Sequence, residues 1–133
     1  MRKSISLAII VLVALVAGAF QGNAQSLHNT DWKAYITALS DTITLHIGTD
    51  TSWVTVTSGD VVVRSLFHVS GDTLSMQDFD GQYACQNGAG TYQYTIKEDK
   101  LVMKMVTDPC DGRVGSINGI VWDKAKMIKN ASH

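Results

Sequence analysis

Short segments of alternating apolar and polar side chains, separated by turn residues, run through the chain from residue 31 onward. Strict alternation is typical of a β-strand with one buried face, and turns at intervals of roughly ten residues are typical of an all-β sandwich or barrel. We predict eight strands, at 31–37, 41–47, 51–57, 61–69, 73–79, 91–97, 100–106 and 118–125.

The alternation also indicates which positions share a face within a strand. Such positions are Ile43, Leu45 and Ile47 in one strand, Tyr92, Tyr94 and Ile96 in another, and Leu101, Met103 and Met105 in the next. A sheet with one apolar face must curl onto itself or pack against a second sheet, and closure also removes its exposed edges. The sequence therefore predicts an all-β fold, an eight-stranded antiparallel up-and-down β-barrel, although a flattened sandwich would give the same alternation.

No segment shows the pattern of a long amphipathic helix. The segment 109–116, "PCDGRVGS", is the best candidate for a helical turn. Asp108 could cap it and Pro109 could occupy its first helical position, since both residue types favour helix starts. Gly115 or Gly119 would then end it.

The first 24 residues have the pattern of a secretory signal peptide. Arg2 and Lys3 precede an apolar run from Ile5 to Phe20, and small residues stand at 22 and 24. The apolar run is shorter than the ~20 residues of a spanning helix, and no cysteine for a lipid anchor lies near the cleavage point. We expect a signal peptide at 1–24 and one domain at 25–133, secreted or periplasmic, with no membrane span after cleavage.

The charge of the chain argues against a nucleic-acid partner. Two of its eleven Lys and Arg, and none of its twelve Asp and Glu, lie within residues 1–24, which leaves a net charge near −3 for the rest. No basic stripe or arginine-rich run occurs, and such a feature would be needed to bind a phosphate backbone. We expect a folded, monomeric domain.

Cys85 and Cys110 are the only cysteines, and they lie 25 positions apart. In an oxidising compartment, two cysteines in a small domain most often form a disulfide. A metal site is the alternative, but two thiolates need further ligands. The four histidines show no paired spacing with the cysteines; they are His28, His46, His68 and His133. We predict a disulfide, no metal and no other cofactor.

Motifs for nucleophilic, phosphate-binding or zinc-dependent chemistry are not found in this sequence, so no catalytic residue is assigned. His46 alternates with threonines, which predicts an exposed side chain. His68 shares its parity with Arg64 on a mixed face and could point into a barrel cup. Asp78 and Asp80 could do acid–base work or bind Ca²⁺, but a plain turn is the simpler interpretation.

Aromatic and methionine side chains on the strand faces are candidates for a ligand-binding lining. In a filled barrel they are core, and in an open one they line a pocket for a small, largely hydrophobic ligand, with arginine, histidine or a tyrosine hydroxyl as the polar group. The candidate ligand-binding residues are Arg64, Phe67, His68, Met76, Tyr92, Tyr94, Met103 and Met105.

One set of residues resembles the small bacterial lipocalin-like proteins of the calycin group. The set comprises Trp32 near the start of the first strand, Cys85, Gly90 with Tyr92, the strand 101–106, the "D-x-C-x-x-R" turn of Asp108, Cys110 and Arg113, and Trp122 near the end. The resemblance implies a barrel whose "DPCDGR" turn is joined by the disulfide to the loop that holds Cys85. It also implies structural roles for Trp32 and Trp122. Arg113 would reach a carboxylate or backbone carbonyls at the barrel end, or stack on Trp32.

Three functions are consistent with these observations. The first is non-catalytic binding of a small, largely hydrophobic ligand, which the resemblance favours. The second is a small isomerase or hydrolase that uses His68 or the pair Asp78 and Asp80. The third is a protein-interaction module of the cell envelope with a filled barrel and an exposed apolar patch.

Overall fold

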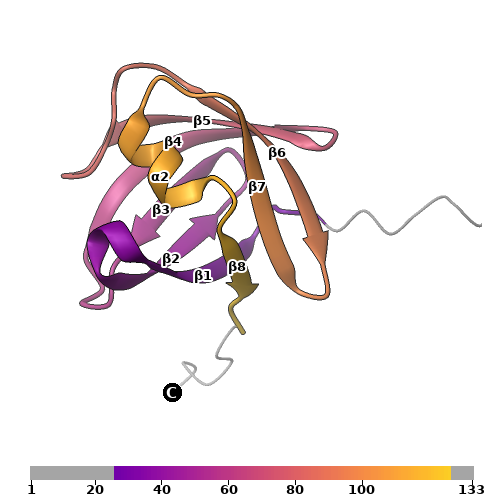
Figure 1. Ribbon diagram of the computed structural model, residues 1–133, viewed down its shortest axis with the longest axis horizontal. Coiled ribbons are helices and arrows are strands. Elements are labelled where there is room, and N and C mark those ends of the chain that lie inside the picture. The colour runs from indigo at the N-terminus through magenta and orange to yellow at the C-terminus, as the bar shows by residue number, and fades with distance from the viewer. Residues whose placement is uncertain (1–25, 127–133) are drawn as a thin grey trace, which may run out of the picture.

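The computed structural model describes residues 26–126 and shows a closed antiparallel β-barrel (Figure 1). Its elements are β1 (Thr30–Ile36), η1 (Thr37–Leu39), β2 (Asp41–Ile47), β3 (Thr51–Thr55), β4 (Val61–Ser70), β5 (Thr73–Asp80), β6 (Gly90–Lys97), β7 (Lys100–Thr107), α2 (Asp111–Ile117) and β8 (Val121–Lys124). Each strand pairs with the next, and β8 pairs with β1 to close the sheet. The predicted eight-stranded barrel is confirmed. The predicted signal peptide lies outside the described residues.

Helix α2 begins later than the sequence suggested. The sequence predicted Asp108 as the N-cap and Pro109 as the first helical residue. In the structure the N-cap is Cys110, the helix starts at Asp111, and Asp108 lies two residues before the cap. The Asp108 carboxylate accepts hydrogen bonds from the Cys110 N–H and from the guanidinium of Arg113. The helix reaches Ile117, and Gly119 follows with a φ of 74°, so β8 starts at Val121 instead of residue 118.

Three register shifts interrupt the strand ladders. They fall between Val54 and Thr55, between Arg64 and Ser65, and between Thr91 and Tyr92. An extra residue in one strand bends that strand and increases its twist. These shifts therefore help short strands to close into a narrow barrel, and they change which side chains face inward.

The connections between strands divide the barrel into two ends. Because the strands run alternately up and down, the β1–β2, β3–β4, β5–β6 and β7–β8 connections share one end, which we call the helix end. This end carries the longest connections, residues 81–89 and 108–120, and with them α2 and η1. In Figure 1, α2 and η1 lie on the same side of the barrel.

The core is made of inward-facing apolar side chains from the strands and from Leu27, which precedes β1. Trp32 on β1 and Trp122 on β8 are among its largest fully buried members. The indole N–H of Trp32 donates to the hydroxyl of Thr30 at 2.8 Å. No helix between residues 26 and 126 has the length and apolar character needed to cross a membrane.

Candidate functional site

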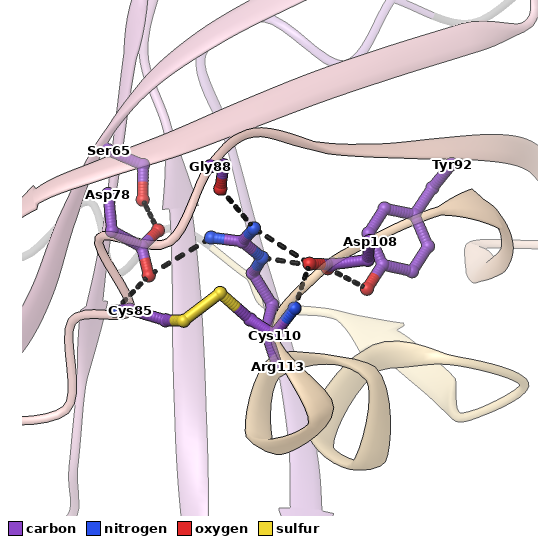
Figure 2. Close-up of a disulfide and its surroundings, with 8 residues drawn as sticks. All are labelled: Ser65, Asp78, Cys85, Gly88, Tyr92, Asp108, Cys110 and Arg113. Carbon is purple, nitrogen blue, oxygen red and sulfur yellow. Dashed lines mark hydrogen bonds and ion pairs between the residues drawn. A yellow bond between two sulfur atoms is a disulfide. The ribbon is translucent and has the colours of Figure 1, made fainter.

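Arg113 is buried at the helix end of the barrel, although it belongs to a short surface helix (Figure 2). Its Nε and Nη2 donate to the two carboxylate oxygens of Asp108, each at 2.8 Å. Nη2 also donates to the carbonyl of Gly88 at 2.7 Å, and Nη1 lies 3.3 Å from Asp78 Oδ2. One planar guanidinium therefore joins β5, the β5–β6 connection and the segment that precedes α2.

The disulfide and the buried charges form one unit. Cys85 and Cys110 are bonded to each other, which confirms the predicted pairing. The N–H of Cys85 donates to Asp78 Oδ2 at 2.9 Å, and the N–H of Cys110 donates to Asp108 Oδ1 at 2.9 Å. The disulfide therefore holds in place the two backbone donors that Asp78 and Asp108 need. We call Asp78, Asp108 and Arg113 the buried ionic cluster.

Asp78 and Asp80 do not form the simple turn that the sequence suggested. Asp78 lies in β5 with a side chain only 3% exposed, and Ser65 donates to its Oδ1 at 2.7 Å. Asp80 ends the strand, is exposed, and lies 3.6 Å from the guanidinium of Arg64. The plain-turn interpretation is wrong for Asp78, because the strand continues through it and turns its carboxylate inward.

A close glycine makes room for the cluster. A Cβ at Gly90 would lie 2.4 Å from Asp108 Oδ2 and 3.0 Å from Arg113 Nε, so any side chain there would displace the ion pair. Tyr92, two residues later, donates its hydroxyl to Asp108. Both positions of the "G-x-Y" spacing therefore act on the Asp108 carboxylate: Gly90 leaves space for it, and Tyr92 donates a hydrogen bond to it.

Burial and hydrogen bonding act against each other on these groups. Burial would raise the pKa of Asp108, but the hydrogen bonds from Arg113, Tyr92 and the Cys110 N–H outweigh it and lower the pKa below its usual value. Burial would lower the pKa of Arg113, but the bond to Asp108 and the charges of both carboxylates raise it. Burial and the hydrogen bond to Asp108 raise the pKa of the Tyr92 hydroxyl. Asp108 and Arg113 thus retain their charges, and Tyr92 stays neutral.

We expect the fold to lose stability in acid through Asp108. Its pKa is lower in the folded state than the ~3.9 of an unfolded aspartate, so its contribution is fully present above that value and is lost as the pH falls toward the folded pKa. Denaturant unfolding from neutral pH down to about pH 2 should show this loss, and Asp108→Asn should have a shallower slope below about pH 4. Asp111→Asn, an exposed position in the same turn, is the control. An unchanged slope in Asp108→Asn would contradict the assignment.

A cavity of about 310 Å³ lies beside the buried ionic cluster, inside the helix end of the barrel. Apolar side chains make most of its wall, among them Ile43, Leu45, Val54, Met76, Ile117 and Trp122. Its polar lining includes Ser52, Ser65, Asp78 and Arg113. The cavity is thus an apolar space with a few polar groups, among which Asp78 faces Arg113 and accepts from Ser65.

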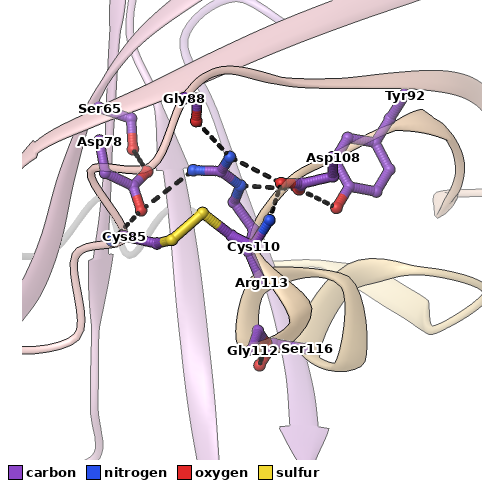
Figure 3. A network of polar contacts seen from close by, with 10 residues as sticks. All are labelled: Ser65, Asp78, Cys85, Gly88, Tyr92, Asp108, Cys110, Gly112, Arg113 and Ser116. Carbon is purple, nitrogen blue, oxygen red and sulfur yellow. Dashed lines mark hydrogen bonds and ion pairs between the residues drawn. A yellow bond between two sulfur atoms is a disulfide. The ribbon is translucent and has the colours of Figure 1, made fainter.

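The cavity meets solvent between three elements of the helix end. Leu39 from η1, Tyr83 from the β5–β6 connection and Gly112 from α2 all line it, yet Tyr83 is 50% exposed and Gly112 is also exposed. Ser116, one turn along α2, lines it as well and donates to the carbonyl of Gly112 (Figure 3). We call Leu39, Tyr83, Gly112 and Ser116 the rim.

The predicted ligand-binding residues occupy three different environments. Met76 lines the cavity. Phe67, Tyr92 and Met103 are buried in the core and Tyr94 packs against it, with its hydroxyl donating to the carbonyl of Gly71 at 3.0 Å. Arg64, His68 and Met105 are exposed.

The expectation that Arg64 and His68 point into the barrel is wrong. Both share the sequence parity of Val62, which is buried. Val54 pairs with Val63 and Thr55 pairs with Val61, so Val62 is an extra residue in the ladder. After this extra residue, Ser65 and Phe67 are the side chains of β4 that point into the barrel. Arg64 and His68 alternate with them and therefore face solvent. A similar shift leaves Val106 as an extra residue near Met105.

His46 lies on the outer face of the sheet, but it is not an isolated side chain. Its Nδ1 lies 2.9 Å from Asp31 Oδ1, and its Nε2 lies 2.9 Å from Thr55 Oγ1. Its ring also stacks on Trp53, with centroids 5.1 Å apart. The order carboxylate, imidazole, hydroxyl is that of a hydrolase triad, but the cavity lies on the other face of this sheet. The arrangement joins three strands across a solvent-facing surface.

The sequence interpretation did not identify Ser52, Ser65 or the rim as part of a site. Ser52 and Ser65 are buried polar residues at inward positions of β3 and β4. The signal that could have found them is a serine on the inward parity of a strand, where an apolar residue is expected. The residues that the structure describes contain no group of three or more His, Cys, Asp or Glu side chains placed to hold a metal ion.

Comparisons of this chain with protein-family models, with curated proteins and with solved structures find no match. Its class is therefore defined by its own geometry. It is a closed eight-stranded antiparallel barrel with one disulfide, one buried ionic cluster and an apolar cavity at the end that these features hold together.

Proposed function

We propose that this protein is a lipocalin-like binding protein that takes up a small, largely hydrophobic ligand in the barrel cavity without chemical change. The observation that carries the proposal is the cavity of about 310 Å³ with its apolar wall. Ligand sites typically have volumes of roughly 300–1,000 Å³, apolar linings and a few placed polar groups. Such a space inside an eight-stranded barrel is large enough for one small molecule.

The proposed setting is a secreted or periplasmic one. The Cys85–Cys110 disulfide supports it, because disulfides persist in oxidising compartments. The signal-peptide pattern of residues 1–24 and the resemblance to the small bacterial lipocalin-like proteins point the same way. We propose a monomeric carrier, since one barrel holds the whole cavity.

The cavity favours this function over the two alternatives. A protein-interaction module with a filled barrel does not account for an apolar space of this size. An enzyme based on His68 or on Asp78 with Asp80 would need these groups at one site. His68 and Asp80 are exposed, whereas the Asp78 carboxylate is buried and occupied by Ser65, Cys85 and Arg113.

The direct experiment is titration of the ligand-free, oxidised protein with a neutral apolar fluorophore such as N-phenyl-1-naphthylamine. We expect a saturable rise in fluorescence with one probe per chain. Native mass spectrometry of the protein recovered from its host should show a small molecule that dissociates on denaturation. Absence of saturable binding for this and other apolar probes would reject the proposal.

Closing the rim should weaken binding. Gly112 lines the cavity and Gly115 does not, yet both lie in α2, both are exposed, and a Cβ at either position would meet no atom within 4 Å. We expect Gly112→Trp to lower the affinity for N-phenyl-1-naphthylamine about tenfold or more, which corresponds to roughly 1.4 kcal/mol.

Gly115→Trp is the matched control and should bind the probe as the unmodified protein does. Both substitutions replace a helical glycine, so their effects on folding should be similar. Equal affinities in the two variants would show that the probe does not enter past α2.

A further inference from the structure

Ser52 places a hydroxyl in the wall of the cavity, at a position where an apolar side chain is expected. It lies on β3 with its side chain directed into the barrel, lines the cavity and is only 3% exposed. Val54, the next inward residue of the same strand, is apolar and lines the cavity as well. A hydroxyl in an apolar surrounding is costly unless it has a hydrogen-bond partner, so a serine here calls for one.

The protein supplies no such partner within the part of the chain that the structure describes. None of the side-chain hydrogen bonds between residues 26 and 126 involves the Ser52 hydroxyl, whereas Ser65, directly opposite on β4, donates to Asp78 at 2.7 Å (Figure 2). Of these residues, only Arg113 and Trp122 have a side-chain nitrogen or oxygen atom that is both closed to solvent and unpaired. The Ser52 oxygen is thus unpaired but not closed off, and the cavity is the space that it faces.

Ser52 lies at the inner end of the cavity, away from the rim. Because β3 runs toward the helix end, Ser52 precedes Val54 along the direction that leads to the rim. Ile47 pairs with Ser52 across β2 and β3, yet it belongs to the core and does not line the cavity, and the same holds for Phe67 on β4. These core side chains close the barrel below Ser52. A ligand that enters past the rim therefore meets Ser52 with its leading end.

The hydrogen bonds beside Ser52 determine which head group fits there. Ser65 gives its proton to Asp78, so its oxygen offers only lone pairs, while the Ser52 hydroxyl is free to donate or to accept. A ligand hydroxyl matches these two serines, because it can accept one hydrogen bond and donate another. An ionic head group would lose its hydration to an apolar wall with one free hydroxyl, which is an unfavourable exchange.

We infer that Ser52 determines the specificity of the cavity, and that the ligand is an uncharged primary alcohol bound with its hydroxyl at Ser52. Its apolar chain extends toward the rim and packs on aliphatic side chains such as Leu45 and Val54. This inference rests on the proposed function, because it names the chemical class and the orientation of the ligand in the same cavity.

Three isomers of the same composition test the inference. They are 1-octanol, with a terminal hydroxyl, 4-octanol, with its hydroxyl within the chain, and 1-methoxyheptane, whose oxygen near the chain end accepts but cannot donate. Their affinities are measured on the oxidised full chain by displacement of N-phenyl-1-naphthylamine. We expect 1-octanol to bind about three- to tenfold more tightly than either isomer, as for one additional well-placed hydrogen bond.

The role of the serine is tested by Ser52→Ala, which removes the hydroxyl and keeps a small inward side chain. We expect this variant to bind 1-octanol about three- to tenfold more weakly and 4-octanol as before, so that the preference among the isomers disappears. Differences in the hydration of the probes cancel, since the same three probes are compared on both proteins. Ser75→Ala is the matched control, because Ser75 lies on β5 between the buried residues Leu74 and Met76 and points away from the barrel interior. It should retain the preference for 1-octanol.

The outcomes separate the two proposals. If neither the fluorophore nor any isomer binds, the proposed function fails and this inference fails with it. If the fluorophore binds but the three isomers compete equally or not at all, or if Ser52→Ala retains the preference for 1-octanol, only the assignment of Ser52 and of the alcohol is overturned. Equal affinities for 1-methoxyheptane and 1-octanol would likewise overturn the alcohol class. Because the comparison among the isomers uses the unmodified protein, it decides the question even if the Ser52 variant does not fold.

Discussion

Replacement of Arg113 by methionine is expected to lower the free energy of unfolding by about 3–5 kcal/mol. The substitution removes the one positive charge that faces two buried carboxylates. Asp78 and Asp108 would then lie in the barrel with no countercharge, and the carbonyl of Gly88 would lose its donor. The loss comes mainly from these unpaired groups, because a buried ion left without its partner is far costlier than an exposed one.

Arg64→Met is the matched control for this prediction. Arg64 also has a carboxylate partner, Asp80 at 3.6 Å, but both side chains are about half exposed or more, at 48% and 67%. An exposed ion pair contributes about 0–1 kcal/mol, so this variant should unfold near the denaturant midpoint of the unmodified protein. Chemical denaturation followed by circular dichroism measures both. Similar midpoints for the Arg113 and Arg64 variants would show that the buried ionic cluster contributes little.

Arg113→Lys adds a second comparison within the cluster. Lysine keeps the charge but lacks the planar fork that bonds both oxygens of Asp108 at 2.8 Å. We expect its stability to lie between those of the unmodified protein and Arg113→Met. This variant also keeps the prediction testable if the methionine variant does not fold, since a domain of this size has only about 5–15 kcal/mol of stability in total.

Removal of the disulfide is expected to have the second-largest effect, about 3.5 kcal/mol. The bond closes a loop of 25 residues, and the loss of loop-closure entropy in the unfolded chain accounts for a stabilisation of this size. In the folded state the bond also joins the two segments whose N–H groups bind Asp78 and Asp108. The double variant Cys85→Ala with Cys110→Ala should therefore unfold at clearly lower denaturant concentration.

The unmodified protein in a strong reductant serves as the control for the double variant. Reduction keeps both sulfur atoms, so it separates loss of the bond from loss of the side chains. We expect the reduced protein and the double variant to have similar midpoints. A difference below about 1 kcal/mol between oxidised and reduced protein would show that the bond constrains neither the unfolded chain nor the cluster.

The strands were predictable because their signal is local. Alternation with a period of two identifies a strand and its buried face from a few residues, as for Ile43, Leu45 and Ile47, and all three are buried. The disulfide was predictable for a different reason, since two cysteines allow only one pairing. The start of α2 was not, because Asp108 also accepts from Tyr92 on β6, and this contact arises only when the fold brings the two segments together.

The candidate site was predicted less well. One extra residue in a strand moves every following side chain to the opposite face of the sheet, so alternation in the sequence no longer indicates which side chains point inward. Val62 is such a residue, and beyond it Arg64 and His68, which the sequence offered only as candidates for an inward position, face solvent. Side chains that fill the core and side chains that line a cavity also occupy the same inward positions of a barrel, so alternation alone cannot tell them apart. Met76 and Met103 have the same pattern in the sequence and both are buried in the core, yet only Met76 also lines the cavity.

The sequence by itself determined the class of fold, the number and order of the strands and the pairing of the cysteines. Each of these follows from short-range alternation, turn residues or the count of one residue type. Only the tertiary structure decided that Asp78 faces Arg113, and that the helix end encloses a space which the core side chains do not fill. The physical reason is that an empty volume and a shared countercharge both depend on how side chains from distant segments meet after the barrel closes.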